Sequence, residues 1–170
     1  METYAEISHL KENNRVMDQY TIFIVEDNEM YSFMLDYKLK SNFKYNLITF
    51  SSGEECLKNL YLKPDAIILD YNLPGINGFD VVQEMKKLSP STKIIILSEQ
   101  KNKKVILKLL NEKIYDYLEK GMDSASRIDS LLREIISTIE EKKLNYGLMV
   151  RLTIFLTLVL IIYLIISAAT

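Results

Sequence analysis

Residues 66–78 of the chain read AIILDYNLPGING. Four aliphatic residues are followed by Asp70 and then by a loop rich in turn-forming residues: Asn72, Pro74, Gly75, Asn77 and Gly78. A short aliphatic run bounded by turn residues is typical of a strand buried on both faces of a parallel sheet. We therefore predict a buried strand over Ala66–Leu69, with Asp70 just past its carboxyl end.

Other runs along the chain have the same character. They are rich in aliphatic and aromatic residues, and they cover Tyr20–Val25, Tyr45–Phe50, Lys93–Leu97 and Ile114–Leu118. Segments with the apolar spacing of helices lie between them and after the last one, starting near Asn28, Ser52, Gly78, Lys101 and Ser124. Five successive β/α units predict an α/β fold with a five-stranded, parallel, doubly wound sheet.

Polar side chains stand just past the ends of these strands. Glu26 and Asp27 follow the first strand, Asp70 the third, Ser98 the fourth and Lys120 the fifth. Open parallel sheets bind their ligands outside the carboxyl ends of the strands. We expect these side chains to form one site.

Three of these residues are carboxylates, which repel one another when they share a sheet edge. Two unit charges about 4 Å apart cost about 4 kcal/mol at an effective dielectric constant of 20. Mg²⁺ relieves such repulsion, because it prefers one or two carboxylates together with phosphate and water oxygens. Asp70 is then a nucleophile toward a phosphoryl group, which Lys120 and Ser98 neutralise and position.

Each residue also has a purely structural interpretation. Asp27 and Ser98 could cap the helices that follow them, and Lys120 could be a solvated loop lysine. The presence of all these chemical types at one edge favours a site over a set of independent caps.

Composition limits the other functions of the chain. The 170 residues carry a net charge of -2, and the pI of about 5.6 gives no overall basic character for binding nucleic acid. Cys56 is the only cysteine, which excludes an internal disulfide, and its apolar helical neighbours predict a small core residue. His9 is the only histidine and has no companion for a metal site.

Residues 152–169 carry no charge. As a helix they span about 27 Å, close to the ~30 Å hydrocarbon core of a bilayer. We predict a transmembrane helix here, and the alternatives are an oligomerisation helix or a core helix of a partner complex. Lys142, Lys143 and Arg151 precede the span, so the positive-inside bias predicts a single-pass protein of the inner membrane with its α/β domain in the cytoplasm.

The chain from Tyr20 to about Lys143 resembles the receiver domain of two-component response regulators, including the chemotaxis regulators. The resemblance is carried by residues 22–28 (IFIVEDN), 66–78, 94–98 (IIILS) and 115–120 (YDYLEK). It implies a flavodoxin-like sheet with the strand order 2-1-3-4-5.

The resemblance also implies a Mg²⁺ site. Asp70 is the phosphoacceptor, which takes phosphate from a histidine kinase or phosphotransfer protein. Asp27 ligates Mg²⁺ directly, Glu26 does so through water, and Asn72 contributes its backbone carbonyl beside Asp70.

By the same resemblance, Lys120 binds the phosphoryl group, and Ser98 and Tyr117 form the switch that responds to it. Tyr117 could instead be an ordinary core tyrosine. Glu99 and Gly121 depart from the family pattern, which has a small residue and a proline at these positions. Glu99 adds a negative charge at the phosphoryl entrance, which puts the rates of phosphorylation and hydrolysis in doubt.

These observations predict four segments: an N-terminal extension (1–19), a receiver domain (20–143), a juxtamembrane linker (144–151) and a transmembrane helix (152–169). We expect a membrane-tethered, stand-alone receiver without enzymatic activity, acting as an adaptor or phosphorelay intermediate. A downstream protein would bind its fourth helix, fifth strand and fifth helix. The alternatives are a receiver-fold scaffold that no longer switches, which Glu99 favours, and an aspartyl-phosphate phosphatase, which lacks a second acid at Asn72.

Overall fold

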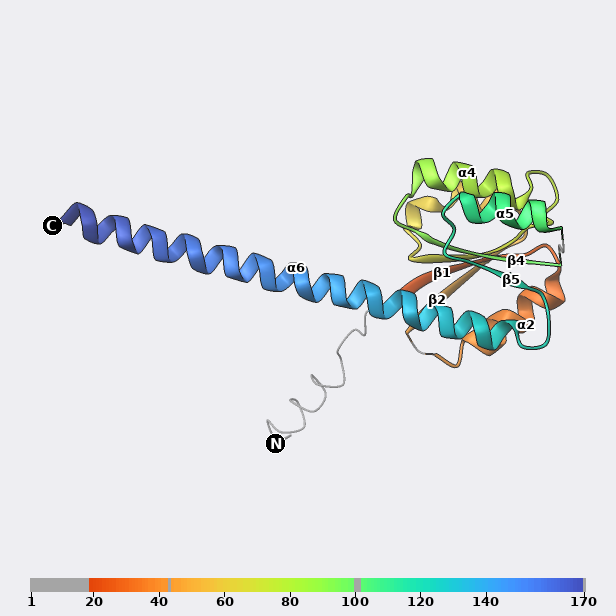
Figure 1. Ribbon diagram of the computed structural model, residues 1–170. Coiled ribbons are helices and arrows are strands. Elements are labelled where there is room, and N and C mark those ends of the chain that lie inside the picture. The colour runs from red at the N-terminus through yellow and green to blue at the C-terminus, as the bar shows by residue number, and fades with distance from the viewer. Residues whose placement is uncertain (1–18, 43, 100–101, 170) are drawn as a thin grey trace, which may run out of the picture. The chain divides into compact units, whose positions relative to one another are not determined.

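The computed structural model describes residues 19–42, 44–99 and 102–169. Its centre is a five-stranded sheet with the order β2-β1-β3-β4-β5, in which all neighbouring strands are parallel (Figure 1). The strands are β1 (Tyr20–Val25), β2 (Tyr45–Phe50), β3 (Ala66–Asp70), β4 (Lys93–Ser98) and β5 (Asp116–Glu119). The predicted α/β class and strand order are confirmed.

The ends of the strands differ slightly from the prediction. β3 and β4 each extend one residue further, so Asp70 and Ser98 are the last residues of their strands. β5 begins two residues later than predicted: Lys113, with a left-handed φ of 56°, ends the turn after α5, and Ile114 and Tyr115 precede the strand. Ile114 remains buried, which explains why its hydrophobicity suggested a strand residue.

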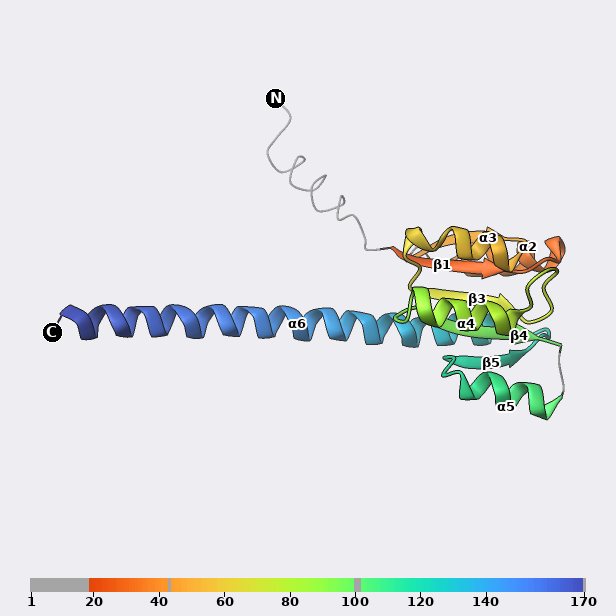
Figure 2. The same ribbon diagram turned by 90° about the horizontal axis from the view of Figure 1, so that it is seen from above.

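Helices cover both faces of the sheet, as Figure 1 shows, and Figure 2 looks down on one of these faces. On one face lie α3 (Gly53–Lys58), α4 (Gly78–Leu88) and α5 (Lys103–Asn111), and a short 3-10 helix, Leu60–Leu62, follows α3. On the other face lie α2 (Glu29–Leu39) and the first turn of α6 (Ser124–Ala169). All of these helices except α6 lie between successive parallel strands, as the doubly wound pattern requires.

Polar N-caps begin the four helices that connect the strands. The side chains of Asn28, Ser52, Asn77 and Asn102 each accept a hydrogen bond from a backbone N–H in the first turn of their helix. The apolar residues of α2 do not all lie on its buried side. Leu35 and Leu39 are buried, whereas Met30, Phe33 and Tyr37 are exposed.

The core lies between the sheet and its helices. Phe23, Ile67, Leu69, Val81, Met85 and Ile96 are fully buried in it. Cys56 belongs to the same cluster, which confirms the predicted core role, and burial raises the pKa of its thiol to about 12. The thiol therefore stays protonated and unreactive at neutral pH.

Gly78 allows α4 to start close against the end of β3. Its N–H donates to the carbonyl of Tyr71 at 2.9 Å. A Cβ atom at this position would lie 2.7 Å from the carbonyl oxygen of Asp70 and 2.7 Å from the Cα of Tyr71. Both are backbone atoms, so only glycine fits without moving the turn that carries Asp70.

The chain divides into two compact units, residues 1–129 and 130–170. Most of the second unit is the long remainder of α6, which continues as one helix through Asn145 and Gly147. Among the described residues, α6 is the one helix long and apolar enough to cross a membrane, with a mean hydropathy of 2.6 over its most apolar 18 residues. None of that window is buried.

We predict that Gly78→Ala destabilises the fold by about 1–3 kcal/mol, the usual cost of overpacking. The measurement is urea unfolding of the full chain followed by circular dichroism. Gly121→Ala is the matched control, because a Cβ there meets nothing within 4 Å, and its effect should stay within about 0.5 kcal/mol. Equal stability of the two variants would show that the β3–α4 turn relaxes freely.

Candidate functional site

Glu26, Asp70 and Lys120 form a compact charged cluster at the carboxyl edge of the sheet. The Lys120 ammonium donates to Oδ2 of Asp70 at 2.8 Å and to Oε1 of Glu26 at 2.9 Å, and it lies 2.7 Å from Oε2 of Glu26. Glu26 and Asp70 are buried, and Lys120 is largely so. Each buried charge therefore has an opposite charge in hydrogen-bond contact, which offsets its desolvation.

The backbone holds each member of the cluster in place. The N–H of Glu26 donates to the carbonyl of Phe50 at 3.0 Å, which continues the pairing of β1 with β2 past the strand end. The N–H of Lys120 donates to the carbonyl of Ser98 at 3.0 Å. Oδ1 of Asp70 accepts the N–H of Asn72 at 3.1 Å, so the loop after β3 orients the carboxylate.

The pKa values in the cluster reflect burial and pairing together. Burial raises the pKa of Glu26 above its ordinary value, and the hydrogen bond from Lys120 only partly offsets that rise. Burial lowers the pKa of Lys120, but its hydrogen bonds to Asp70 and Glu26 outweigh burial and raise it overall. Lys120 is therefore firmly protonated at neutral pH.

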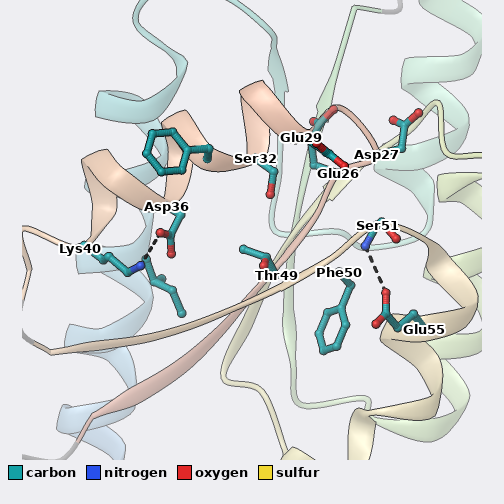
Figure 3. A pocket seen from close by; sticks show the side chains of 12 residues that line it. Glu26, Asp27, Glu29, Ser32, Asp36, Lys40, Thr49, Phe50, Ser51 and Glu55 are labelled. Atoms are coloured by element: carbon teal, nitrogen blue, oxygen red, sulfur yellow. Dashed lines mark hydrogen bonds and ion pairs between the residues drawn. The ribbon is translucent and has the colours of Figure 1, made fainter.

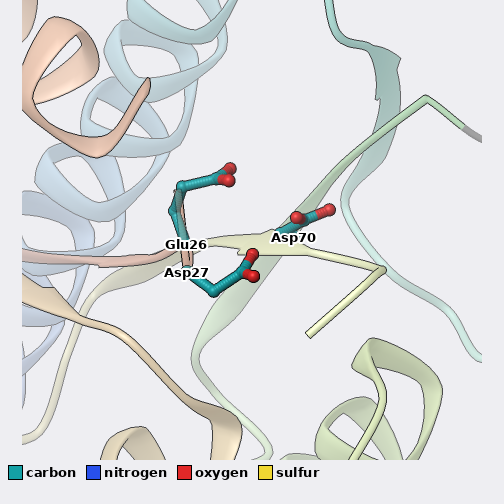
Figure 4. Close-up of side chains that lie close together, drawn as sticks. All are labelled: Glu26, Asp27 and Asp70. Carbon is teal, nitrogen blue, oxygen red and sulfur yellow. The ribbon is translucent and has the colours of Figure 1, made fainter. Parts of the chain in front are cut away.

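Asp27 completes an acidic group that could hold a metal ion. Glu26, Asp27 and Asp70 each offer an oxygen, and these oxygens lie within 4.8 Å of one another (Figure 4). Asp27 is exposed and forms no hydrogen bond or ion pair with other described residues. Several carboxylate oxygens with an open side toward solvent suit a hard cation such as Mg²⁺, which keeps some of its waters.

Ser98 and Tyr117 also meet at this edge. Ser98 is fully buried at the end of β4, and Tyr117 lies in the neighbouring strand β5. Burial raises the pKa of the Tyr117 hydroxyl, and a hydrogen bond with the Ser98 side chain opposes that rise. The two predicted switch residues are thus in direct contact, and the Ser98 backbone is in contact with Lys120.

Two cavities border the cluster. One, of about 570 Å³, extends from Glu26 and Asp27 between α2 and β2, and the carboxylates of Glu29, Asp36 and Glu55 also line it (Figure 3). The other, of about 650 Å³, is lined by Lys120, Glu99, Tyr31, Met34, Lys38, Gly121 and Met122. Glu99 therefore shares a cavity with Lys120.

Two residues of the site were not predicted from the sequence. The ring of Tyr31 lies 4.9 Å from the Lys120 ammonium, and its hydroxyl is 2.7 Å from Oγ of Ser124. Oε1 of Glu54 accepts the N–H of Ile76 at 3.0 Å and so secures the loop after Asp70. The next residue, Glu55, accepts the N–H of Ser51 at 3.3 Å and so caps the start of α3.

Comparison with known proteins places the fold in one family. Residues 22–133 match the response regulator receiver domain. The chemotaxis protein CheY of Thermotoga maritima is 25% identical over 111 residues, covering 65% of this chain and 92% of CheY. The regulatory protein PhoP of Bacillus subtilis is 32% identical over 131 residues, covering 72% of this chain and 53% of PhoP.

Solved structures agree on the fold. The receiver domain of a LuxO repressor protein from Vibrio parahaemolyticus superposes with a TM-score of 0.68 at 22% identity, covering 74% of this chain and 96% of that domain. The chain spans only 35% of the length of the curated regulator CssR, and about half of PhoP. The part shared with these longer regulators is the α/β unit described above, and the chain belongs to the response regulator receiver domain family.

Proposed function

We propose that the chain is a membrane-tethered receiver that is phosphorylated on Asp70 with the help of Mg²⁺. Receiver domains are signalling domains that bind Mg²⁺ at an acidic pocket and interact with histidine kinases or phosphotransfer proteins. The observation that carries the proposal is the cluster of three acids and one lysine, in which the Lys120 ammonium contacts Asp70 at 2.8 Å.

In the proposed reaction, a carboxylate oxygen of Asp70 attacks the phosphorus of a phosphohistidine. A new O–P bond forms, the N–P bond breaks, and the electron pair leaves with the imidazole of the donor. A bound Mg²⁺, held by Asp27, Asp70, the Asn72 carbonyl and, through water, Glu26, would neutralise phosphoryl charge. Lys120 is placed to move its hydrogen bond from Asp70 to a phosphoryl oxygen.

The switch follows from the contact between Ser98 and Tyr117. A phosphoryl group on Asp70 adds close to two negative charges and draws hydroxyl donors toward it. Once the Ser98 hydroxyl turns to the phosphoryl group, its hydrogen bond with Tyr117 must rearrange. Tyr117 then repacks, and β5 carries the change to a downstream protein bound to α5, β5 and the first turn of α6.

The first test is phosphorylation of the full chain in detergent with Mg²⁺ and acetyl phosphate or phosphoramidate. We expect one stoichiometric, base-labile phosphoryl group, which mass spectrometry assigns to Asp70. Asp70→Asn should abolish it, and Asp123→Asn, in an exposed loop, should not. Label that persists in Asp70→Asn refutes the assignment, and a wild-type chain without any label favours the non-switching scaffold that Glu99 suggests.

A second prediction concerns the charge balance of the cluster. Without Mg²⁺, Lys120→Met leaves two buried carboxylates unpaired and should cost about 3–5 kcal/mol of stability. Mg²⁺ can take over the neutralising role, and a ligand at 100 times its Kd adds about 2.7 kcal/mol. We therefore expect Mg²⁺ to raise the melting temperature of Lys120→Met more than that of the wild type.

The matched control for that experiment is Lys58→Met, which removes an exposed lysine. It should melt like the wild type with and without Mg²⁺. Equal Mg²⁺ effects in all three proteins would contradict the expectation that Lys120 and the ion share the neutralisation of the acidic group.

The proposed tether is the apolar part of α6, residues 152–169. Two arginines at the centre of a span, as in Leu158→Arg/Ile162→Arg, disfavour insertion by about 2.5–3.5 kcal/mol each. We expect the wild type to remain in membranes after alkaline carbonate washing and this variant to be released. Met30→Arg/Met122→Arg is the control, since these side chains are 82% and 94% exposed in the first unit, and it should remain bound.

A further inference from the structure

The loop that joins Lys120 to α6 receives little support from packing. Gly121, Met122 and Asp123 are exposed, and a Cβ atom at Gly121 would meet nothing within 4 Å. Glycine also leaves the backbone more conformational freedom than any other residue. The N–H of Lys120 donates to the carbonyl of Ser98, but the chain immediately after Lys120 needs another restraint.

A series of hydrogen bonds supplies this restraint. Oγ of Ser124, a buried residue, donates to the carbonyl of Gly121 at 2.7 Å. This bond uses the single hydroxyl hydrogen of Ser124, so the Tyr31 hydroxyl is the donor in its 2.7 Å contact with the serine oxygen. Hydrogen bonds in such a series strengthen one another. We call the series from Tyr31 through Ser124 to the Gly121 carbonyl the hydroxyl relay.

The start of α2 holds Tyr31 in place. Oδ1 of Asn28, the N-cap of α2, accepts the N–H of Tyr31 at 3.0 Å. Asn28 in turn donates its own N–H to Oε1 of Glu26 at 3.3 Å. Tyr31 is therefore joined to the charged cluster through the backbone of α2, and its ring lies beneath the Lys120 ammonium, 4.9 Å from it.

The contact with Tyr31 differs in kind from the other contacts of the Lys120 ammonium. Within residues 19–42, 44–99 and 102–169, the ion-pair partners of Lys120 are Glu26 and Asp70. The Tyr31 ring is a neutral partner, at a distance where a cation and an aromatic face attract each other. This attraction does not depend on the charge of Asp70, so it persists when the ammonium moves from Asp70 to a phosphoryl oxygen.

We propose that Tyr31 and Ser124 are positioning residues, which hold the Lys120 ammonium ready for the phosphoryl group. The inference rests on the proposed function. The hydroxyl relay fixes the tyrosine ring and the loop after Lys120 together, so the ammonium is in place before the phosphoryl group arrives. A preorganised donor needs no rearrangement while charge develops in phosphoryl transfer. Loss of the relay frees the ring and the loop, and the transfer slows.

The first test compares initial rates of phosphorylation by phosphoramidate with Mg²⁺, using the full chain in detergent. Tyr31→Phe and Ser124→Ala each break the bond between the two hydroxyls. Each should lower the rate by about two- to fivefold, as expected when a contact between a cation and an aromatic ring is weakened. The double variant should lose no more than Ser124→Ala alone, because the bond is already broken. Ser124→Thr keeps a hydroxyl and should react at nearly the wild-type rate.

Matched controls make the same chemical changes elsewhere. Tyr37→Phe removes the hydroxyl of an exposed tyrosine in the same helix. Ser41→Ala removes a hydroxyl that, like that of Ser124, donates to the backbone carbonyl three residues earlier. Both controls should react like the wild type. Melting curves followed by circular dichroism identify any variant whose slower reaction reflects unfolding.

A second readout does not require phosphorylation. In protein with isotope-labelled lysine, the ε-CH₂ protons of Lys120 should show an upfield NMR shift caused by the ring of Tyr31. Lys120→Arg assigns this signal by its disappearance. Tyr31→Leu removes the ring and should move the signal to the position of the other lysines. Ser124→Ala should reduce the shift, and Ser124→Thr should retain it.

The two readouts separate this inference from the proposed function. A wild-type chain that takes up no phosphoryl group contradicts the proposed function, and the lysine signal then still decides whether the hydroxyl relay holds Lys120. A wild-type reaction rate in Tyr31→Phe overturns the inference, as do rate losses that multiply in the double variant. A lysine signal that Ser124→Ala leaves unchanged overturns it as well.

Discussion

The charged cluster at the carboxyl edge of the sheet depends on one interaction, the contact of the Lys120 ammonium with the buried carboxylates of Glu26 and Asp70. Two carboxylates in a buried position repel each other strongly, and removal of the lysine would leave both without compensation. The lysine does not fully balance the acids, because Asp27 adds a third carboxylate within reach of the other two. The remaining negative charge is what makes the edge receptive to a divalent cation.

The surrounding structure keeps this cluster in position. Gly78 lets α4 approach the end of β3 closely, and Glu54 holds the N–H of Ile76, so the loop after Asp70 is secured at two points. On the opposite side, Tyr31 contacts Lys120 with its ring and Ser124 with its hydroxyl. Tyr31 therefore links the charged cluster to the first residue of α6. A movement of Lys120 would change the contacts of Tyr31, and through Tyr31 those of Ser124, without any change in the hydrophobic core.

Much of this arrangement could be predicted from the sequence, for physical reasons. Strands buried on both faces are marked by aliphatic runs, and parallel strands send their carboxyl ends to one edge, so the gathering of Glu26, Asp27, Asp70, Ser98 and Lys120 followed from their places in the chain. The strand order was implied by resemblance. The contacts of Tyr31 and Glu54 could not be predicted, because they join residues 93 and 22 positions apart and depend on side-chain directions.

The start of β5 was wrong for a related reason. Hydrophobicity marks burial, and Ile114 is buried in the segment between the turn at the left-handed residue Lys113 and the start of β5. In the segment that starts near Asn28, apolar spacing predicted the helix α2 correctly but does not reveal its buried side, since Met30, Phe33 and Tyr37 are exposed. Periodicity thus identifies an element more reliably than it identifies the face that packs.

The buried cysteine has a practical consequence for spectroscopy. The chain contains no other cysteine, and the Cys56 thiol is enclosed in the core with a pKa of about 12. The native protein is therefore expected to react very little with maleimides and methanethiosulfonates. A single cysteine placed on any exposed helix would accept a fluorophore or spin label selectively, so distances within the full chain can be recorded without first deleting a native thiol.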